Sequence, residues 1–301
     1  MSIQFEVFDE PSIDGTRVLV HSFSGFMDAG SASQIAVDHL LKTCDTRLIA
    51  ELDPDDVVDY RARRPKMTYD SDHFTGIEIP TVQLFEATDM RGSKFLLLTG
   101  PEPDYRWGEF IDCVTSLIEA LGVDLTIGLI GIPWPAPHTR PMGVTFHGTR
   151  PELIAGHTST LGELEIPGHI AAMLEYHLGE AGHDAMGLAV QVPHYLTQFD
   201  YPRAAIALLR GLAGASGLSL ETDELEEAAA QADAEISRQT SDSEEFPPLL
   251  QALETQYDDS LSGTGEPEDG VPQVSMPDAD QIGAQVERFL AEMDSHRPDG
   301  Q

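Results

Sequence analysis

Short apolar runs that alternate with longer amphipathic segments constrain the fold of this chain more than any other sequence feature. The runs are rich in Val, Leu and Ile, and each ends at a turn that contains glycine or proline. The amphipathic segments are about 11 to 15 residues long, which is enough for three or four turns of helix. Such alternation is typical of βαβ units and predicts an α/β fold with a mostly parallel sheet. The predicted strands are residues 16–22, 47–52, 94–99, 124–132 and 185–192, and the predicted core helices are residues 31–41, 107–121, 168–182 and 201–212.

Four segments between these elements are less regular. Residues 53–74 are polar and contain two prolines, so they are predicted to form an irregular excursion from the core. Residues 76–86 alternate apolar and polar side chains, which favours a strand or a hairpin. Short strands are expected at residues 144–146 and 152–154.

The composition changes near residue 220. Residues 221–301 contain 22 acidic and three basic residues, so their net charge is 3 − 22 = −19. Apolar stripes at helical spacing predict three further helices, and a linker rich in Gly, Pro, Ser and Asp separates the last two. We therefore expect an α/β core over residues 1–220 and an acidic helical extension over residues 221–301. The predicted helices are residues 222–238, 246–257 and 278–293, and the flexible linker is residues 258–277.

The whole chain is strongly acidic, with 52 acidic residues against 17 basic ones and a formal net charge of −35. Such a charge repels phosphate backbones and anionic lipid, so we expect neither nucleic acid nor a membrane as a partner. The basic cluster formed by Arg61, Arg63, Arg64 and Lys66 is too small for a nucleic-acid footprint. Two interpretations of the acidity stay open: it keeps the chain soluble, or it matches a partner with a basic surface.

Three features predict a cytoplasmic location. No apolar run reaches the roughly 18 residues of a membrane-spanning helix. The first residues lack the basic and apolar regions of a secretory signal. Cys44 and Cys113 are too few for a disulfide framework, so they are expected to be buried, reduced thiols.

Polar residues follow four of the predicted strands at their carboxyl ends. Asp28 precedes a predicted helix and either caps that helix or faces a ligand. Glu102 lies between two prolines, in a rigid turn that suits either a binding residue or a solvated or salt-bridged carboxylate. His138 has the chemistry of a base, and Arg140 would either clamp an anion or neutralise a neighbouring carboxylate. His194 follows the last of these strands.

The carboxyl ends of parallel strands lie along one edge of a sheet, so these five residues are predicted to frame one pocket. The turn over residues 24–30 matches neither a G-x-G-x-x-G fingerprint nor a P-loop, and there is no G-x-S-x-G elbow. The 11 histidines contain no H-E-x-x-H pattern, and His169, His177 and His183 are interpreted as surface residues of a helix. We therefore predict no catalytic residue, no cofactor and no metal.

Five motifs occur in a definite order along the chain. They are residues 23–33 (FSGFMDAGSAS), Asp59-Tyr60-Arg61 through Arg64-Pro65, residues 97–103 (LLTGPEP) with Trp107 and Phe110, residues 137–141 (PHTRP), and residues 192–195 (VPHY) with Tyr201 and Pro202. Each motif alone is unspecific, but together they resemble the PAC2 family, which is named for a proteasome assembly chaperone. The resemblance extends over residues 15–215 and is strongest to the actinobacterial branch.

The resemblance implies a three-layer α/β/α fold similar to purine nucleoside phosphorylases and related hydrolases, with the acidic helices added at the C-terminal end. It also implies a homo-oligomer, with a trimer as the expected number, and protein partners, since eukaryotic and archaeal relatives bind proteasome α-subunits during assembly. Our first hypothesis is therefore a non-enzymatic, assembly-chaperone-like protein. The alternative is a small-molecule-binding protein or an enzyme of the phosphorylase or hydrolase type that uses the predicted pocket, because fold alone does not decide function.

Overall fold

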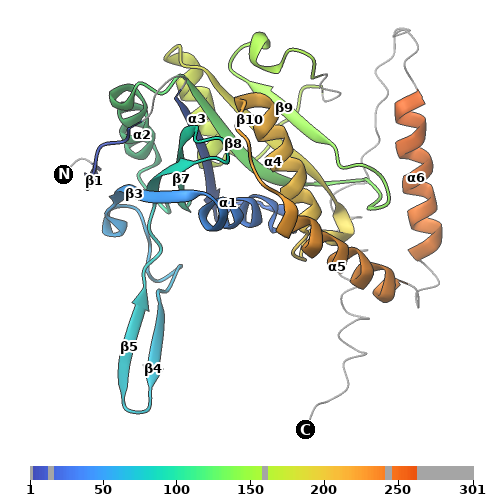
Figure 1. The fold of residues 1–301 in the computed structure, drawn as a ribbon, viewed down its shortest axis with the longest axis horizontal. Helices are drawn as coiled ribbons and strands as arrows, with labels where there is room; N and C mark the ends of the chain where they lie inside the picture. Colours follow the sequence, from blue (N-terminus) through green and yellow to red (C-terminus); the bar gives the residue numbers. More distant parts are fainter. Residues whose placement is uncertain (1–2, 13–16, 158–161, 241–245, 263–301) are drawn as a thin grey trace. The chain divides into compact units, whose positions relative to one another are not determined.

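An eight-stranded mixed sheet forms the centre of the protein (Figure 1). The structure is a computed structural model and describes residues 3–12, 17–157, 162–240 and 246–262. In spatial order the strands are β1 (Phe5–Val7), β3 (Asp45–Leu52), β6 (Gln83–Thr88), β7 (Lys94–Pro101), β2 (Val18–Ser24), β8 (Leu125–Trp134), β10 (Ala185–Pro193) and β9 (Val144–Gly148). Strands β7, β2, β8 and β10 are parallel neighbours, and β3 runs in the same direction. Strands β1, β6 and β9 run the opposite way, so the sheet is mostly parallel, as predicted.

Helices cover both faces of this sheet, which confirms the three-layer α/β/α fold. Two helices pack against each face, and a fifth packs on the outside of one of them. One face carries α1 (Ala32–Thr43) and α4 (Pro202–Ser216), with α5 (Asp223–Thr240) packed on α4, and the other carries α2 (Trp107–Leu121) and α3 (Ile170–Glu180).

The central strands are apolar on both faces because a helical layer covers each of them. In β7, Phe95 and Leu97 pack on the side of α1 and α4, whereas Leu96 and Leu98 pack on the side of α2 and α3. Each of these four side chains is buried. The continuous apolar run that predicted this strand is therefore a consequence of its burial between two layers.

The structure corrects two predictions of local structure. Residues 152–154 were expected to be a strand, but they belong to a 3-10 helix over Pro151–Ile154, because Pro151 suits a helix start and has no N–H for a strand ladder. Residues 53–74 were expected to be irregular, but they contain β4 (Lys66–Asp70), which pairs with β5 (His73–Glu78). These two strands form a separate hairpin that extends away from the main sheet (Figure 1).

The chain divides into two units, Met1–Glu254 and Thr255–Gln301. Helix α6 (Phe246–Ser262) begins in the first unit, and its last residues are the described part of the second. It continues through residues 258–262, where the predicted linker begins. The rest of that linker and the predicted helix over residues 278–293 lie outside the described residues. No helix in the described ranges is long and apolar enough to cross a membrane.

Candidate functional site

The four turns that carry the predicted site residues lie along one edge of the sheet. They follow β7, β2, β8 and β10, which are successive parallel neighbours. Hydrogen bonds link the turns to one another, since the Glu102 N–H donates to the Ser24 carbonyl at 2.7 Å and the Gly30 N–H donates to the Thr197 carbonyl at 3.0 Å. We call this edge the carboxyl edge.

Asp28 caps α1 and joins it to the neighbouring strand. Its Oδ1 accepts the backbone N–H of Ser33 at 2.9 Å, and its Oδ2 accepts that of Gln34 at 2.9 Å. Oδ1 also accepts the N–H of Gly131 in β8 at 3.1 Å. A side chain at Gly131 would collide, because its Cβ would lie 2.4 Å from the Ala29 carbonyl oxygen. The geometry of Asp28 therefore fits the capping interpretation, and both of its carboxylate oxygens accept backbone N–H groups.

Glu102 caps the helix on the opposite face of the sheet. It is buried, with 8% of its surface exposed, and its Oε1 accepts the backbone N–H of Ile170 at 2.7 Å. Ile170 is the first residue of α3, where the helix dipole stabilises a negative charge. Glu102 thus fastens the end of β7 to the start of α3.

His138 and Arg140 lie together at a third place on the carboxyl edge. The Tyr195 hydroxyl lies 2.8 Å from His138 Nδ1 and also accepts the His138 backbone N–H at 2.8 Å. Arg140 forms an ion pair of 3.2 Å with Glu254 of α6, so it neutralises a carboxylate. The Phe246 ring, also on α6, packs edge-on against Tyr195 with their ring centroids 5.3 Å apart. The first half of α6 therefore covers this part of the edge.

His194 lies next to this group, and burial dominates its properties. Its ring contacts Tyr195 with their centroids 5.3 Å apart. Burial lowers the pKa of His194, and a backbone hydrogen bond with Trp134 opposes that shift. Burial also lowers the pKa of His138, with the charge of Glu254 acting in the opposite direction. Both imidazoles are therefore driven toward the neutral form.

Of the five predicted residues, His138 and His194 both contact Tyr195, and Arg140 pairs with Glu254 of the helix that covers His138. Asp28 and Glu102 each bind the N-terminus of a helix. Tyr195 and the α6 residues that cover this group were not among the predicted site residues. Nor were two side chains that are exposed at this edge: Phe26, 40% exposed, and Met27, 38% exposed.

Histidine positions also differ from the sequence-based interpretation. His169 is not on a helix surface but directly precedes α3, where its ring stacks on Phe26 at a centroid distance of 4.8 Å. Burial lowers the pKa of His169, and the nearby Glu102 carboxylate opposes the shift. His147 of β9 contacts Glu175 at 2.9 Å. Within the described ranges, no three His, Cys, Asp or Glu side chains are arranged to hold a metal ion.

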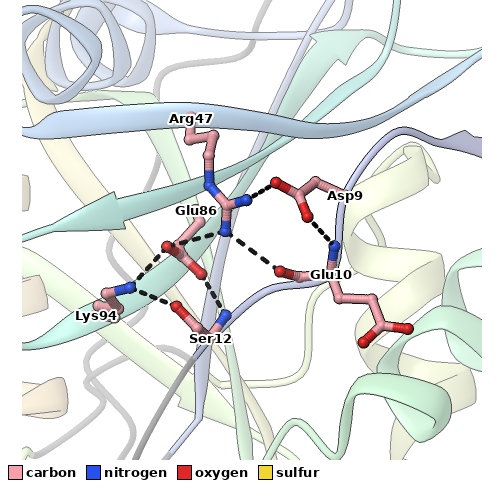
Figure 2. A network of polar contacts seen from close by, with 6 residues as sticks. All are labelled: Asp9, Glu10, Ser12, Arg47, Glu86 and Lys94. Carbon is pink, nitrogen blue, oxygen red and sulfur yellow. Dashed lines mark hydrogen bonds and ion pairs between the residues drawn. The ribbon is translucent and has the colours of Figure 1, made fainter.

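Two open hollows in the described part of the chain lie at the opposite edge, near the amino ends of β3 and β7. The larger, of about 520 Å³, is lined by a polar network that Figure 2 shows. At its centre is the buried Glu86, which accepts the Ser12 N–H at 2.5 Å and pairs with Lys94 at 2.9 Å and Arg47 at 3.3 Å. Burial alone would raise the pKa of Glu86, but these partners outweigh it and lower the pKa. The network fastens the N-terminal segment to β3, β6 and β7.

The structure is that of a three-layer α/β/α protein with helix-capping carboxylates and exposed apolar side chains at its carboxyl edge. The chain belongs to the PAC2 family, because the model of that family matches residues 22–240. The resemblance seen in the sequence motifs is thereby confirmed, and solved structures of actinobacterial proteins support the branch.

Three of these structures are particularly similar. Rv2714 of Mycobacterium tuberculosis, of unknown function, is 42% identical; the match covers 87% of this chain and 93% of that one, with a TM-score of 0.82. A Corynebacterium glutamicum protein of unknown function is 34% identical over 87% of this chain and 99% of its own, with a TM-score of 0.83. Rv2125 of M. tuberculosis, a proteasome-assembly chaperone homologue, is 27% identical over 78% of this chain and 99% of its own, with a TM-score of 0.72. No curated protein matches the chain.

Proposed function

We propose that this protein is a non-enzymatic assembly factor that binds a protein partner at its carboxyl edge, in the cytoplasm and as a homo-oligomer. Family membership supports an assembly role, because Rv2125 is a proteasome-assembly chaperone homologue with the same fold. The proteasome, or another multisubunit complex, is the class of partner that this relationship suggests.

One observation carries the proposal. The carboxylates that would perform acid–base chemistry at the carboxyl edge are bound to backbone N–H groups, as Asp28 and Glu102 illustrate. The same edge exposes Phe26 and Met27, which are large apolar side chains of the kind that anchor protein interfaces. Polar groups here thus support the loops, while apolar groups remain accessible to a partner.

The proposal is tested by mixing the purified protein with recombinant proteasome α-subunits of the same organism. We expect a complex on native gels, or a change in the rate of α-ring formation, and a loss of about tenfold or more in affinity for the Phe26→Ser, Met27→Ser double variant. The control is Tyr176→Ser, which changes a still more exposed aromatic residue on α3, and this variant should bind normally. Absence of both binding and any effect on assembly would contradict the link to the proteasome.

The same protein preparations separate this proposal from a small-molecule function. A nucleoside or nucleotide panel should leave the thermal unfolding midpoint of the wild type unchanged. A ligand that raised the midpoint of the wild type, but not of Arg140→Ala or Glu102→Ala, would favour a ligand-binding role at the carboxyl edge instead.

A further inference from the structure

Residues 162–168 form an exposed segment directly before His169 and α3. Every residue of the segment is exposed, and the segment contains no helix or strand. Two of its side chains are large and apolar: Leu164 is 50% exposed, and Ile166 is 67% exposed. Burial of these side chains against another apolar surface would be favourable, because it would remove them from water.

The same segment carries two acidic side chains that alternate with the apolar ones. No ion pair or hydrogen bond joins Glu163 or Glu165 to another described residue. In an extended conformation, this alternation would place the two carboxylates on one side and Leu164 and Ile166 on the other. A surface that suits the segment would therefore combine apolar side chains with cations nearby.

The carboxyl edge has exposed apolar side chains within reach of this segment. Phe26 and Met27 are 40% and 38% exposed. The His169 ring stacks on the Phe26 ring at a centroid distance of 4.8 Å, so the end of the segment is held at this surface. Ile166 precedes His169 by three residues, over which an extended chain spans roughly 10 Å. Ile166 can therefore reach Phe26 and Met27 while His169 stays in place.

The loop beside Phe26 supplies the cations. The Arg63 guanidinium lies against the Phe26 turn, since a Cβ added at Gly25 would be 2.6 Å from Arg63 Nη2. Arg63 itself is paired with Asp104 at 3.1 Å. Its neighbours in sequence, Arg61 and Arg64, are exposed, and no ion pair joins either of them to another described residue. Two uncompensated cations therefore adjoin the apolar pair, in a chain with a net charge of −35.

The segment can move without losing packed contacts, because all of its residues are exposed. Gly168 lies between the segment and His169, and a Cβ added at Gly168 would meet no atom within 4 Å. Glycine also has the widest choice of backbone angles. Gly168 is therefore suited to act as the hinge of such a movement.

From these observations we propose that residues 163–166 form a strap that closes over Phe26 and Met27. The apolar side chains of the strap cover that pair, and its two carboxylates face Arg61 and Arg64. The structure shows the strap open. Closure itself requires no partner, but a closed strap occupies the surface that a partner binds in the proposed function. The strap would thus regulate partner binding, and this regulatory role rests on the proposed function.

Disulfide trapping detects closure in the free protein. The variant Met27→Cys, Ile166→Cys, made in a Cys44→Ala, Cys113→Ala background, should form an intramolecular disulfide under mild oxidation. Closure brings the two positions within the Cα separation of roughly 4.4 to 6.8 Å that a disulfide requires. The control pairs Ile166→Cys with Met90→Cys, which is 67% exposed but lies near the amino end of β7, at the opposite edge of the sheet. This control should not form the bond, and equal trapping of both pairs, or of neither, overturns the proposal.

Charge reversal tests the contact between the strap and the cations. Addition of Glu163→Lys, Glu165→Lys to the trapping variant should slow disulfide formation about tenfold, because the strap would then be repelled by Arg61 and Arg64. The control is Glu180→Lys, at an exposed acidic residue of α3, which should leave the rate unchanged. A strap variant that is trapped as fast as its parent overturns the contact with the cations.

The regulatory role has a separate readout. If proteasome α-subunits bind the trapping variant, its oxidised form should bind about tenfold or more weakly than its reduced form, because the disulfide holds the strap over the binding surface. Equal binding of both forms would overturn the regulatory role. Absence of binding by either form and by the wild type would contradict the proposed function, whereas the trapping rates would still decide whether the strap closes.

Discussion

His21 is a polar side chain in the middle of an apolar core. It lies on the central strand β2, is 2% exposed, and its Nδ1 has no hydrogen-bond partner among the described residues. Burial, assisted by the charge of nearby His169, lowers the pKa of His21 to about 4. The unfolded chain would bind a proton near pH 6.5, but the folded chain would not do so until about pH 4.

The sign of the resulting pH dependence follows directly. Above pH 6.5 His21 is neutral in the folded and the unfolded state, so it contributes nothing to the pH dependence of stability. As the pH falls from 6.5 toward 4, only the unfolded state gains the proton, so the free energy of unfolding decreases by about 3 kcal/mol from this residue. We expect His21→Leu to lose less stability than the wild type between pH 7 and pH 4.5 in urea unfolding experiments. The control is Val20→Ala, at a buried neighbour of His21, which should lower the free energy of unfolding equally at pH 7 and at pH 4.5. If His21→Leu lost as much stability between these pH values as the wild type does, His21 would not be the cause.

At the scale of elements, Glu102 links two parts of the fold that the sequence separates widely. Glu102→Ala removes a buried acceptor from the first N–H of α3, so the free energy of unfolding should fall by about 2 kcal/mol. Glu102→Gln keeps an oxygen acceptor without the charge and should lose about half as much. Hydrogen exchange should accelerate in the first turn of α3 rather than throughout the chain. The exposed Glu180→Ala at the other end of α3 is the control, and an equal effect there would argue against a specific cap.

The elements that could be predicted from sequence are those whose pattern reflects burial. β7 and β8 are buried on both faces, so their sequences are apolar runs. The end of α2 was predictable from Gly122, which caps the helix with a φ of 59°, the left-handed value that glycine favours. The hairpin was missed because its bulge breaks the two-residue alternation that identifies strands. Sequence patterns also assign apolar side chains to the core of the chain, whereas the apolar side chains of this hairpin are exposed.

The candidate site was predictable in position but not in chemistry. Parallel strand order explains why the turns bearing Asp28, Glu102 and His138 share one edge. Whether a carboxylate there faces solvent or a helix N-terminus depends on contacts between distant residues, such as Glu102 with Ile170. No local pattern encodes the cover that Phe246 and Glu254 place over His138 and Arg140 either. That the five residues form one pocket stays a prediction.

For the whole molecule, net charge is the dominant electrostatic quantity. Even if every one of the 17 basic residues paired with a carboxylate, 52 − 17 = 35 acidic residues would be left without an opposite charge. Several ion pairs within the described ranges are exposed on both sides, for example Lys42–Glu224 and Arg210–Glu226, and such pairs contribute little to stability. Repulsion among the excess carboxylates should therefore outweigh the attraction in the pairs, and it favours the more expanded unfolded chain.

Salt separates these two contributions. Raising NaCl from about 0.01 M to about 1 M shortens the Debye length from roughly 30 Å to 3 Å, which screens the long-range repulsion before it affects the buried Glu86 network. We expect the thermal unfolding midpoint to rise with NaCl, and to rise equally with KCl and choline chloride, because screening depends on ionic strength and not on the cation. A larger effect of one cation would instead indicate ion binding. A midpoint that fell with salt would show that ion pairs, and not repulsion, dominate the electrostatic stability of this fold.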